Sequence, residues 1–211
     1  MIKRIAFNTD ESAAEWYNKR FSDFGVFETT KKYNSLMLEW LEVKEKTEKK
    51  LLDVGCGGGF FLKQAEKFLK CFGVDFSLEA LIQAKKNCNA DLILASASSL
   101  PFKDRSFDFV SCLGSLEHFI EMEKALNEMQ RVLKNKGKAN FYVPNSNFIL
   151  FKLNKATYFQ PNERLASLNE WRKLLEKFFV VEKDFKHTHN SLGRLIPKNL
   201  TYSFSFICSK K

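Results

Sequence analysis

Long apolar runs are missing from this chain of 211 residues. No stretch approaches the ~20 consecutive apolar residues that a membrane-spanning helix needs. The first residues also lack the apolar core of a signal peptide, because Asp10 and Glu11 follow almost at once. We therefore expect a cytoplasmic protein without a membrane span.

Closely spaced cysteine pairs are missing too. The cysteines are odd in number, far apart and mostly inside apolar segments: Cys56, Cys71, Cys88, Cys112 and Cys208. Without a CxxC pair, the sequence indicates neither a zinc site nor a disulfide framework. Buried free thiols in a reducing compartment are the expected state.

Positive charge exceeds negative charge, but the excess is uneven. The formal net charge is +9, and residues 151–211 alone hold 12 Lys/Arg against 5 Asp/Glu, a net charge of +7. Residues 1–50 and 51–150 each come to +1. The basic final third favours an anionic partner.

From residue 51 to 145, short apolar runs alternate with segments of helical periodicity. This alternation predicts βαβ units and an open, doubly wound parallel sheet. Strands are expected at residues 51–54, 71–75, 91–94, 107–112 and 138–143. Helices are expected at 59–69, after an N-cap at Ser77, and at 120–133, where the turn at 135–137 stops the last of them.

The flanking segments have other patterns. Residues 10–50 are helical and charged, and Ser167 with Glu170 forms a capping box for a further helix. Apolar runs at 180–185 and 202–208 predict a terminal antiparallel hairpin. We expect a single domain over 1–211, with a helical N-terminal cap (1–50), a core (51–145), and a substrate-side segment with the terminal hairpin (146–211).

A glycine-rich turn, LLDVGCGGG, spans residues 51–59. Glycines between a strand and a helix let the backbone turn tightly and let a ligand approach without a Cβ in the way. Asp75, at the end of the next expected strand, can accept hydrogen bonds from both hydroxyls of a ribose. These features fit NAD and S-adenosylmethionine equally well.

Three details favour S-adenosylmethionine. Asp53 lies inside the strand before the glycines. A dinucleotide needs no acid at this position, whereas a cofactor with an amino acid tail needs an anion there for its ammonium group. The glycine spacing is G-x-G-x-G, without the G-x-G-x-x-G step that places a pyrophosphate over a helix N-terminus. The third is the segment SLPFKDRSFDFV, residues 99–110, before the fourth strand.

Together with GVDFS at 73–77, LEH at 116–118 and RVLKNKG at 131–137, these motifs resemble the class I S-adenosylmethionine-dependent methyltransferases. The resemblance is to the small-molecule branch that includes the ubiquinone and menaquinone methyltransferases. It covers about residues 50 to 145 in the family's order and spacing. It implies a Rossmann-like, seven-stranded sheet that is mostly parallel with an antiparallel last strand, and S-adenosylmethionine as the cofactor.

By that resemblance, the glycine turn lines the methionine tail, with Asp53 at its amino group. Asp75 binds the ribose, Phe76 lies against the adenine, and Gly114 passes beneath the sulfonium. The family has an acid at the position of Ser96, bonded to the adenine amino group, and serine accepts that bond more weakly. The implied cofactor-binding residues are Asp53, Gly55, Cys56, Gly57, Gly59, Asp75, Phe76, Ser96, Ala97, Leu113 and Gly114.

Catalytic residues are not identified by the sequence. His118, His187 and His189 are candidates for a general base. Some relatives carry Glu-x-x-Glu-His and bind a divalent ion, but Gly114 stands at the first position of that motif, so no metal is expected. Trp16 and Tyr17 either close over the cofactor as part of an N-terminal lid or pack in the core.

Residues 145–164 and 186–198 follow strands whose ends face the ligand, and they carry aromatic and basic residues. A small-molecule acceptor, aromatic or apolar with an anionic group, is therefore expected, although ordinary loop lysines explain the basic residues equally well. An RNA methyltransferase or nucleic-acid-binding protein would use the basic last third, but clear stacking motifs are absent. Two more hypotheses are a non-catalytic relative that keeps the cofactor site and a nicotinamide-dependent oxidoreductase, which Asp53 disfavours.

Overall fold

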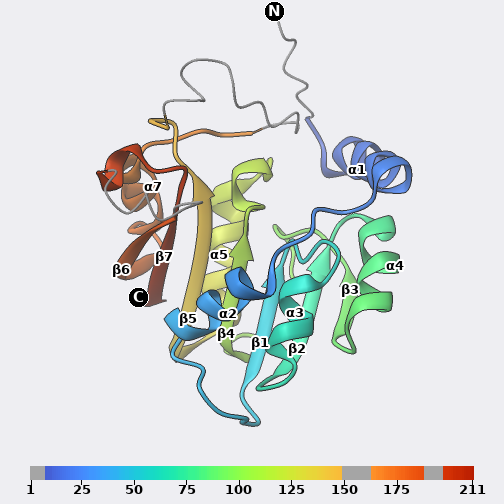
Figure 1. The fold of residues 1–211 in the computed structure, drawn as a ribbon, viewed down its shortest axis with the longest axis horizontal. Coiled ribbons are helices and arrows are strands. Elements are labelled where there is room, and N and C mark those ends of the chain that lie inside the picture. The colour runs from blue at the N-terminus through green and yellow to red at the C-terminus, as the bar shows by residue number, and fades with distance from the viewer. Residues whose placement is uncertain (1–7, 149–162, 188–196) are drawn as a thin grey trace, which may run out of the picture.

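A seven-stranded sheet with helices on both faces forms the centre of the molecule in a computed structural model, which describes residues 8–148, 163–187 and 197–211 (Figure 1). The strands are β1 (Lys50–Val54), β2 (Lys70–Asp75), β3 (Asp91–Leu94), β4 (Phe107–Leu113), β5 (Leu133–Pro144), β6 (Phe179–His187) and β7 (Ser203–Lys210). The helices are α1 (Asp10–Phe24), α2 (Lys31–Trp40), α3 (Phe60–Ala65), α4 (Leu78–Asn87), α5 (Met122–Val132) and α7 (Leu168–Leu175), with short turns of helix η1 (Leu116–His118) and η3 (Lys198–Leu200). None of these helices is long and apolar enough to cross a membrane.

The strand order is β3-β2-β1-β4-β5-β7-β6. All neighbours pair in parallel except β7, which runs antiparallel to both β5 and β6. The sheet is therefore mostly parallel with an antiparallel C-terminal strand, and the predicted doubly wound α/β fold is confirmed. Because the parallel strands end at one edge, the loops after β1, β2, β3 and β4 meet there.

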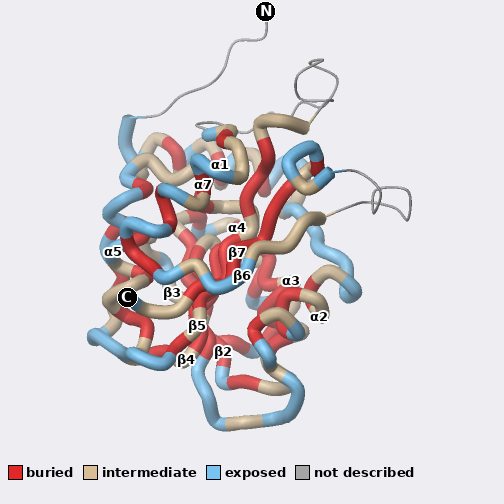
Figure 2. Tube along the Cα trace, turned by 90° about the vertical axis from the view of Figure 1, so that its left-hand side faces the viewer, coloured by how far each residue is buried: buried red, intermediate tan, exposed pale blue. Residues whose placement is uncertain are grey.

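Two apolar layers hold the helices to the sheet. Helices α5 and α7 cover one face, where Trp171, Phe141 and Phe206 are fully buried. Helices α2 and α3 cover the other face around Met37 and Leu62. Burial of each such side chain contributes ~1.5–3 kcal/mol. Figure 2 shows the buried residues following the strands, with exposed residues on the outward sides of the helices.

Helix starts follow the predicted capping. The Ser77 hydroxyl accepts a hydrogen bond from the Ala80 N–H at 3.2 Å. Ser167 and Glu170 form the reciprocal capping box at the start of α7. Both predictions are confirmed, because each side chain satisfies an N–H that the first helical turn leaves without a partner.

Two predicted boundaries are wrong. Helix α3 ends at Ala65 rather than at 69. Strand β5 begins at Leu133 and runs through residues 135–137, where the sequence predicts a turn. A Cβ on Gly137 would lie 2.6 Å from the Leu133 side chain and 2.9 Å from the Asp108 carbonyl oxygen. Gly137 therefore permits a close approach within the sheet and does not stop the helix.

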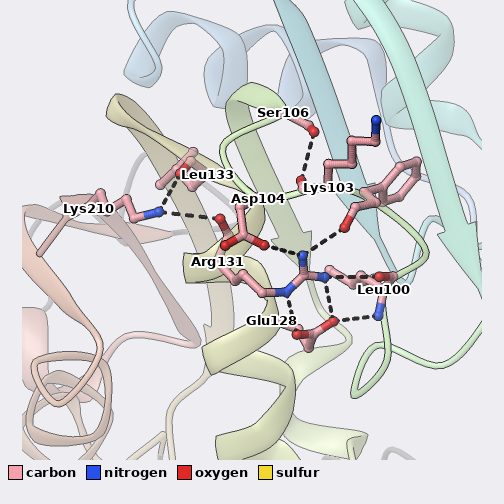
Figure 3. Close-up of polar contacts among 9 residues, drawn as sticks. Leu100, Lys103, Asp104, Ser106, Glu128, Arg131, Leu133 and Lys210 are labelled. Carbon is pink, nitrogen blue, oxygen red and sulfur yellow. Dashed lines mark hydrogen bonds and ion pairs between the residues drawn. The ribbon is translucent and has the colours of Figure 1, made fainter.

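Arg131 ties the segment before β4 to α5 (Figure 3). Its guanidinium donates to the carbonyl oxygens of Leu100 and Phe102 at 3.0 and 2.7 Å, and to the carboxylates of Asp104 and Glu128 at 2.7–2.8 Å. Glu128 in turn accepts from the Leu100 N–H at 2.8 Å. A planar, bidentate donor is needed to serve all these acceptors together.

We expect Arg131→Met to lower the free energy of unfolding by ~2 kcal/mol, because it leaves two carbonyls and Glu128 without their donor. Urea unfolding measures this loss. Lys124→Met on the same helix is the control: its ion pair with Glu121 is exposed, so a change within ~0.5 kcal/mol is expected. Equal losses in the two variants would contradict a structural role for this network.

Candidate functional site

A cavity opens at the edge of the sheet where β1, β2 and β4 end. It is lined by the loops after β1 to β4 and by one face of α1. Of the residues predicted to bind a cofactor, the cavity brings together Asp53, Gly55, Cys56, Gly57, Asp75, Phe76, Ser96, Ala97, Leu113 and Gly114. Gly59 is the exception: it begins α3 in a left-handed conformation, with Cys88 and Ala84 packed against it.

The glycine turn needs its glycines for two different reasons. Gly55 has φ of 74°, and a Cβ there would lie 2.6 Å from the Ser115 side chain, whose hydroxyl donates to the Gly55 carbonyl at 3.0 Å. Gly57 has φ of 49°, and a Cβ there would meet nothing within 4 Å. The backbone of Gly57 is therefore open to a ligand, whereas Gly55 joins the turn to the loop after β4.

Asp53 lies at the end of β1, buried, with the hydroxyl of Ser111 on β4 donating to it at 2.7 Å. Burial raises the pKa of this carboxyl to about 7, although the Ser111 hydrogen bond opposes the rise and Asp75 adds to it. No cation contributes to that shift. The carboxyl is therefore suited to receive a positive charge from a ligand.

Asp75 ends β2 and closes onto the glycine turn. Its two oxygens accept from the backbone N–H groups of Gly57 and Ser77, both at 2.9 Å. Burial raises the pKa of Asp75 to about 6, against the lowering effect of backbone hydrogen bonds from Ser77, Gly57 and Phe76. A carboxylate has four lone-pair sites, so Asp75 keeps capacity for further hydrogen bonding.

Helix α1 lays one face along the cavity. Asp10, Ala13, Tyr17 and Phe21, at helical spacing, all line it. The rings of Tyr17 and Phe76 lie 5.5 Å apart between centroids, and burial raises the pKa of the Tyr17 hydroxyl. Tyr17 thus both packs in the core and lines the cavity, whereas Trp16 packs edge-on against Tyr17 and is not among the lining residues.

Glu117, which the sequence marked only as part of the LEH motif at 116–118, lies close to the site. It is buried beside the cavity, and its Oε2 has no hydrogen-bond partner among the described residues. Its Oε1 lies 3.9 Å from Nε2 of His118 and 4.0 Å from the position of a Cβ on Gly114. Burial raises its pKa to about 8.

An aromatic cluster lies on the other side of Gly114. The rings of Tyr33, Tyr142 and His187 lie 4.8–5.7 Å apart between centroids. A Cβ on Gly114 would be 3.7 Å from the Tyr142 ring. The Ser203 hydroxyl donates to the Tyr142 hydroxyl at 2.7 Å. Gly114 therefore separates the cavity from a partly polar aromatic surface.

The three candidate bases fall in three places. His118 lines the cavity in η1. His187 is the last residue of β6, not part of the loop after it, and its Nε2 lies 3.0 Å from the Ser205 hydroxyl. His189 lies outside the described residues.

The acidic residues of the cavity lining are not balanced by lysine or arginine among the described residues. The carboxylates are those of Asp10, Asp53, Asp75 and Glu121. The chain as a whole has a net charge of +9. An acidic cavity in a basic chain favours a cationic ligand.

Comparison with known proteins finds methyltransferases. Residues 52–141 match the family described as methyltransferase domain. An uncharacterized protein of Methanocaldococcus jannaschii, MJ0638, is 38% identical over 62% of this chain and 53% of its own length. The demethylmenaquinone methyltransferase of Thermotoga maritima is 31% identical over 64% of this chain and 60% of its own.

A solved structure has the same fold. The S-adenosylmethionine-dependent methyltransferase TM1293 of Thermotoga maritima superposes with a TM-score of 0.70 at 21% identity, over 95% of this chain and 98% of that one. The chain spans about half the length of the first two relatives it matches, 53% and 51%. The predicted Rossmann-like fold is confirmed over nearly the whole chain, whereas the sequence matches lie mainly on the part that carries the cavity.

We expect Glu117→Gln to change the pH dependence of stability. In the folded protein the Glu117 pKa is about 8, against an ordinary value of 4.5. Folding therefore favours the protonated form, and the wild type loses stability as the pH rises from about 4.5 through 8. The variant should gain stability relative to the wild type across that range, as measured by urea unfolding at pH 5, 7 and 9.

The control is Glu121→Gln, in the same loop but with a side chain that is 52% exposed and paired with Lys124. Its stability difference from the wild type should not rise over the same range. A Glu117→Gln difference that stays constant with pH would show that the Glu117 carboxyl is not held protonated by burial.

Proposed function

We propose that the protein binds S-adenosylmethionine and transfers its methyl group to a small-molecule acceptor, because residues 52–141 match the methyltransferase domain family. One observation carries the proposal: the cavity presents carboxylates and, in its described lining, no lysine or arginine. A dinucleotide brings a doubly negative pyrophosphate, which these acids would repel. A sulfonium and an ammonium would be attracted.

The proposed cofactor contacts use the carboxylates of the cavity that can still hold a cation or accept hydrogen bonds. Ionised Asp53 holds the ammonium of the methionine tail, which passes over the open backbone at Gly57. Asp75 uses its remaining lone pairs for the two ribose hydroxyls. Phe76 and Ala97 provide an apolar contact for the base. These roles agree with the burial, hydrogen bonds and open Cβ position described above.

S-adenosylmethionine supplies an electrophilic methyl group with a good leaving group attached. The chain therefore has mainly to orient an acceptor and exclude water. We place the acceptor over Gly114, where the absent side chain lets it approach from the cluster of Tyr33, Tyr142 and His187. His118, which lines the cavity, takes the acceptor's proton where one must leave.

The proposed acceptor is aromatic or apolar with an anionic group, as in the ubiquinone and menaquinone branch. The ring cluster supports the aromatic part, and the net charge of +7 in residues 151–211 supports the anionic part. We place the anionic group beside the basic residues predicted in the segment 145–164, of which Lys152 and Lys155 lie outside the described residues.

We expect the affinity for S-adenosylhomocysteine to rise between pH 6 and 8, because Asp53 must lose its proton, with a pKa of about 7, to hold the ammonium. Calorimetric titration measures this rise. Asp53→Asn should bind more weakly and without the rise, whereas Asp108→Asn, at the opposite end of the sheet, should behave as the wild type. NAD should not bind, and tighter binding of NAD would overturn the cofactor assignment.

With methyl-labelled S-adenosylmethionine, we expect faster transfer to anionic aromatic acceptors than to their neutral analogues. Tyr142→Leu should lower kcat/KM for the acceptor by ~10-fold, through loss of the aromatic contact, without weakening S-adenosylhomocysteine binding. Equal rates for anionic and neutral acceptors would refute the anionic group. Label on RNA, with binding that falls steeply with salt, would favour the RNA methyltransferase, and cofactor binding without any transfer would favour a non-catalytic relative.

A further inference from the structure

Helix α1 brings a carboxylate to the cavity. Asp10, the first residue of α1, lines the cavity and accepts a hydrogen bond from the Ser96 hydroxyl, which follows β3. The two residues are 86 positions apart in the chain. Phe76 and Ala97 line the same cavity, so a planar base would have an acid at its edge.

The position of Asp10 is fixed by α1 as a whole. The Asn18 side chain, two turns further along α1, accepts from the Ser77 hydroxyl at 2.7 Å and from the Glu79 N–H at 3.1 Å. The Gln83 amide donates to the Phe21 carbonyl at 3.0 Å. These contacts hold α1 against α4, and the rigid helix then delivers Asp10 to Ser96.

The hydrogen bonds around Ser96 leave Asp10 as the acceptor for a ligand. Ser96 has one hydroxyl proton, which it gives to Asp10, and its oxygen already accepts from the Ser98 N–H at 3.1 Å. It also lies 2.9 Å from the Ser98 hydroxyl. Asp10 keeps its other oxygen and spare lone pairs, and it carries the only negative charge in this group of three side chains.

We propose that Asp10 recognises the 6-amino group of the cofactor's adenine and so selects adenine over purines with a carbonyl at that position. The inference rests on the proposed function, since it assigns Asp10 as a contact of S-adenosylmethionine, the cofactor of that function. A charged acceptor facing an amino group forms a strong, directional hydrogen bond. Facing a carbonyl oxygen at that position, the same carboxylate is repelled by the lone pairs of the oxygen. Ser96 is the positioning residue that orients the carboxylate.

The weaker adenine binding expected from Ser96 alone is then offset by an acid from outside the core. The acid comes from the N-terminal helix, so the adenine contact also joins α1 to the bound cofactor. Cofactor binding therefore stabilises the packing of α1 over the cavity.

The test compares two ligands in one protein: S-adenosylhomocysteine and S-inosylhomocysteine, which has a carbonyl in place of the 6-amino group. We expect the wild type to prefer the adenine compound by about 10- to 100-fold, the size of a charge-assisted hydrogen bond. Asp10→Ala should lose that preference. The ratio of the two affinities within each variant is the readout, because any general weakening from a loosened α1 affects both ligands alike.

Glu11→Gln is the matched control: Glu11 is the next residue of α1, is exposed, and does not line the cavity. It should keep the wild-type ratio, and Ser96→Ala should reduce it less than Asp10→Ala does. Equal wild-type binding of the two ligands, or a preference that survives in Asp10→Ala, overturns the assignment of Asp10. If the wild type binds neither ligand, the proposed function fails and this inference with it.

Discussion

At the carboxyl edge of the sheet, Asp53, Asp75 and Glu117 are held out of water without a neighbouring cation among the causes of their raised pKa values. Desolvating a carboxyl group favours its protonated form, so these acids give the cavity a preference for positive charge. The apolar layers on both faces of the sheet offset the cost of this burial. The proposed selectivity for a cationic cofactor therefore depends on the same core that stabilises the fold.

The parallel pairing of β1 with β2 and β4 fixes where these acids lie. Asp53 pairs with Gly73 and Ser111, so the Ser111 hydroxyl is adjacent to the acid by register alone. The acid on α1 has no such constraint from the sheet. It reaches the cavity only because α1 packs on α4. Strand register therefore places Asp53 in the cavity, whereas helix packing places Asp10 there.

Local patterns in the sequence were sufficient for much of the fold and for part of the site. The alternation of apolar runs located the strands, and Ser77 and the capping box depend on residues within one helical turn. The contact between Asp10 and Ser96 could not be predicted, because the two residues are 86 positions apart and meet only through the packing of α1. Glu117 stood out only as part of the LEH motif at 116–118, and its burial could not be predicted, because it depends on the packing around it.

Strand β7 lies between β5 and β6, and among the described residues β6 pairs with no strand but β7. Residues 179–187 and 203–210 are close in the chain and can pair with each other first. The pair joins the sheet only when residues 203–210 close a loop of roughly sixty residues onto β5. Pairing between strands so far apart in the chain is slow, because the chain loses conformational entropy on closing the loop before the new contacts can compensate for it. The surface that carries His187 is therefore completed late in folding, after the cofactor-binding half of the sheet can already exist.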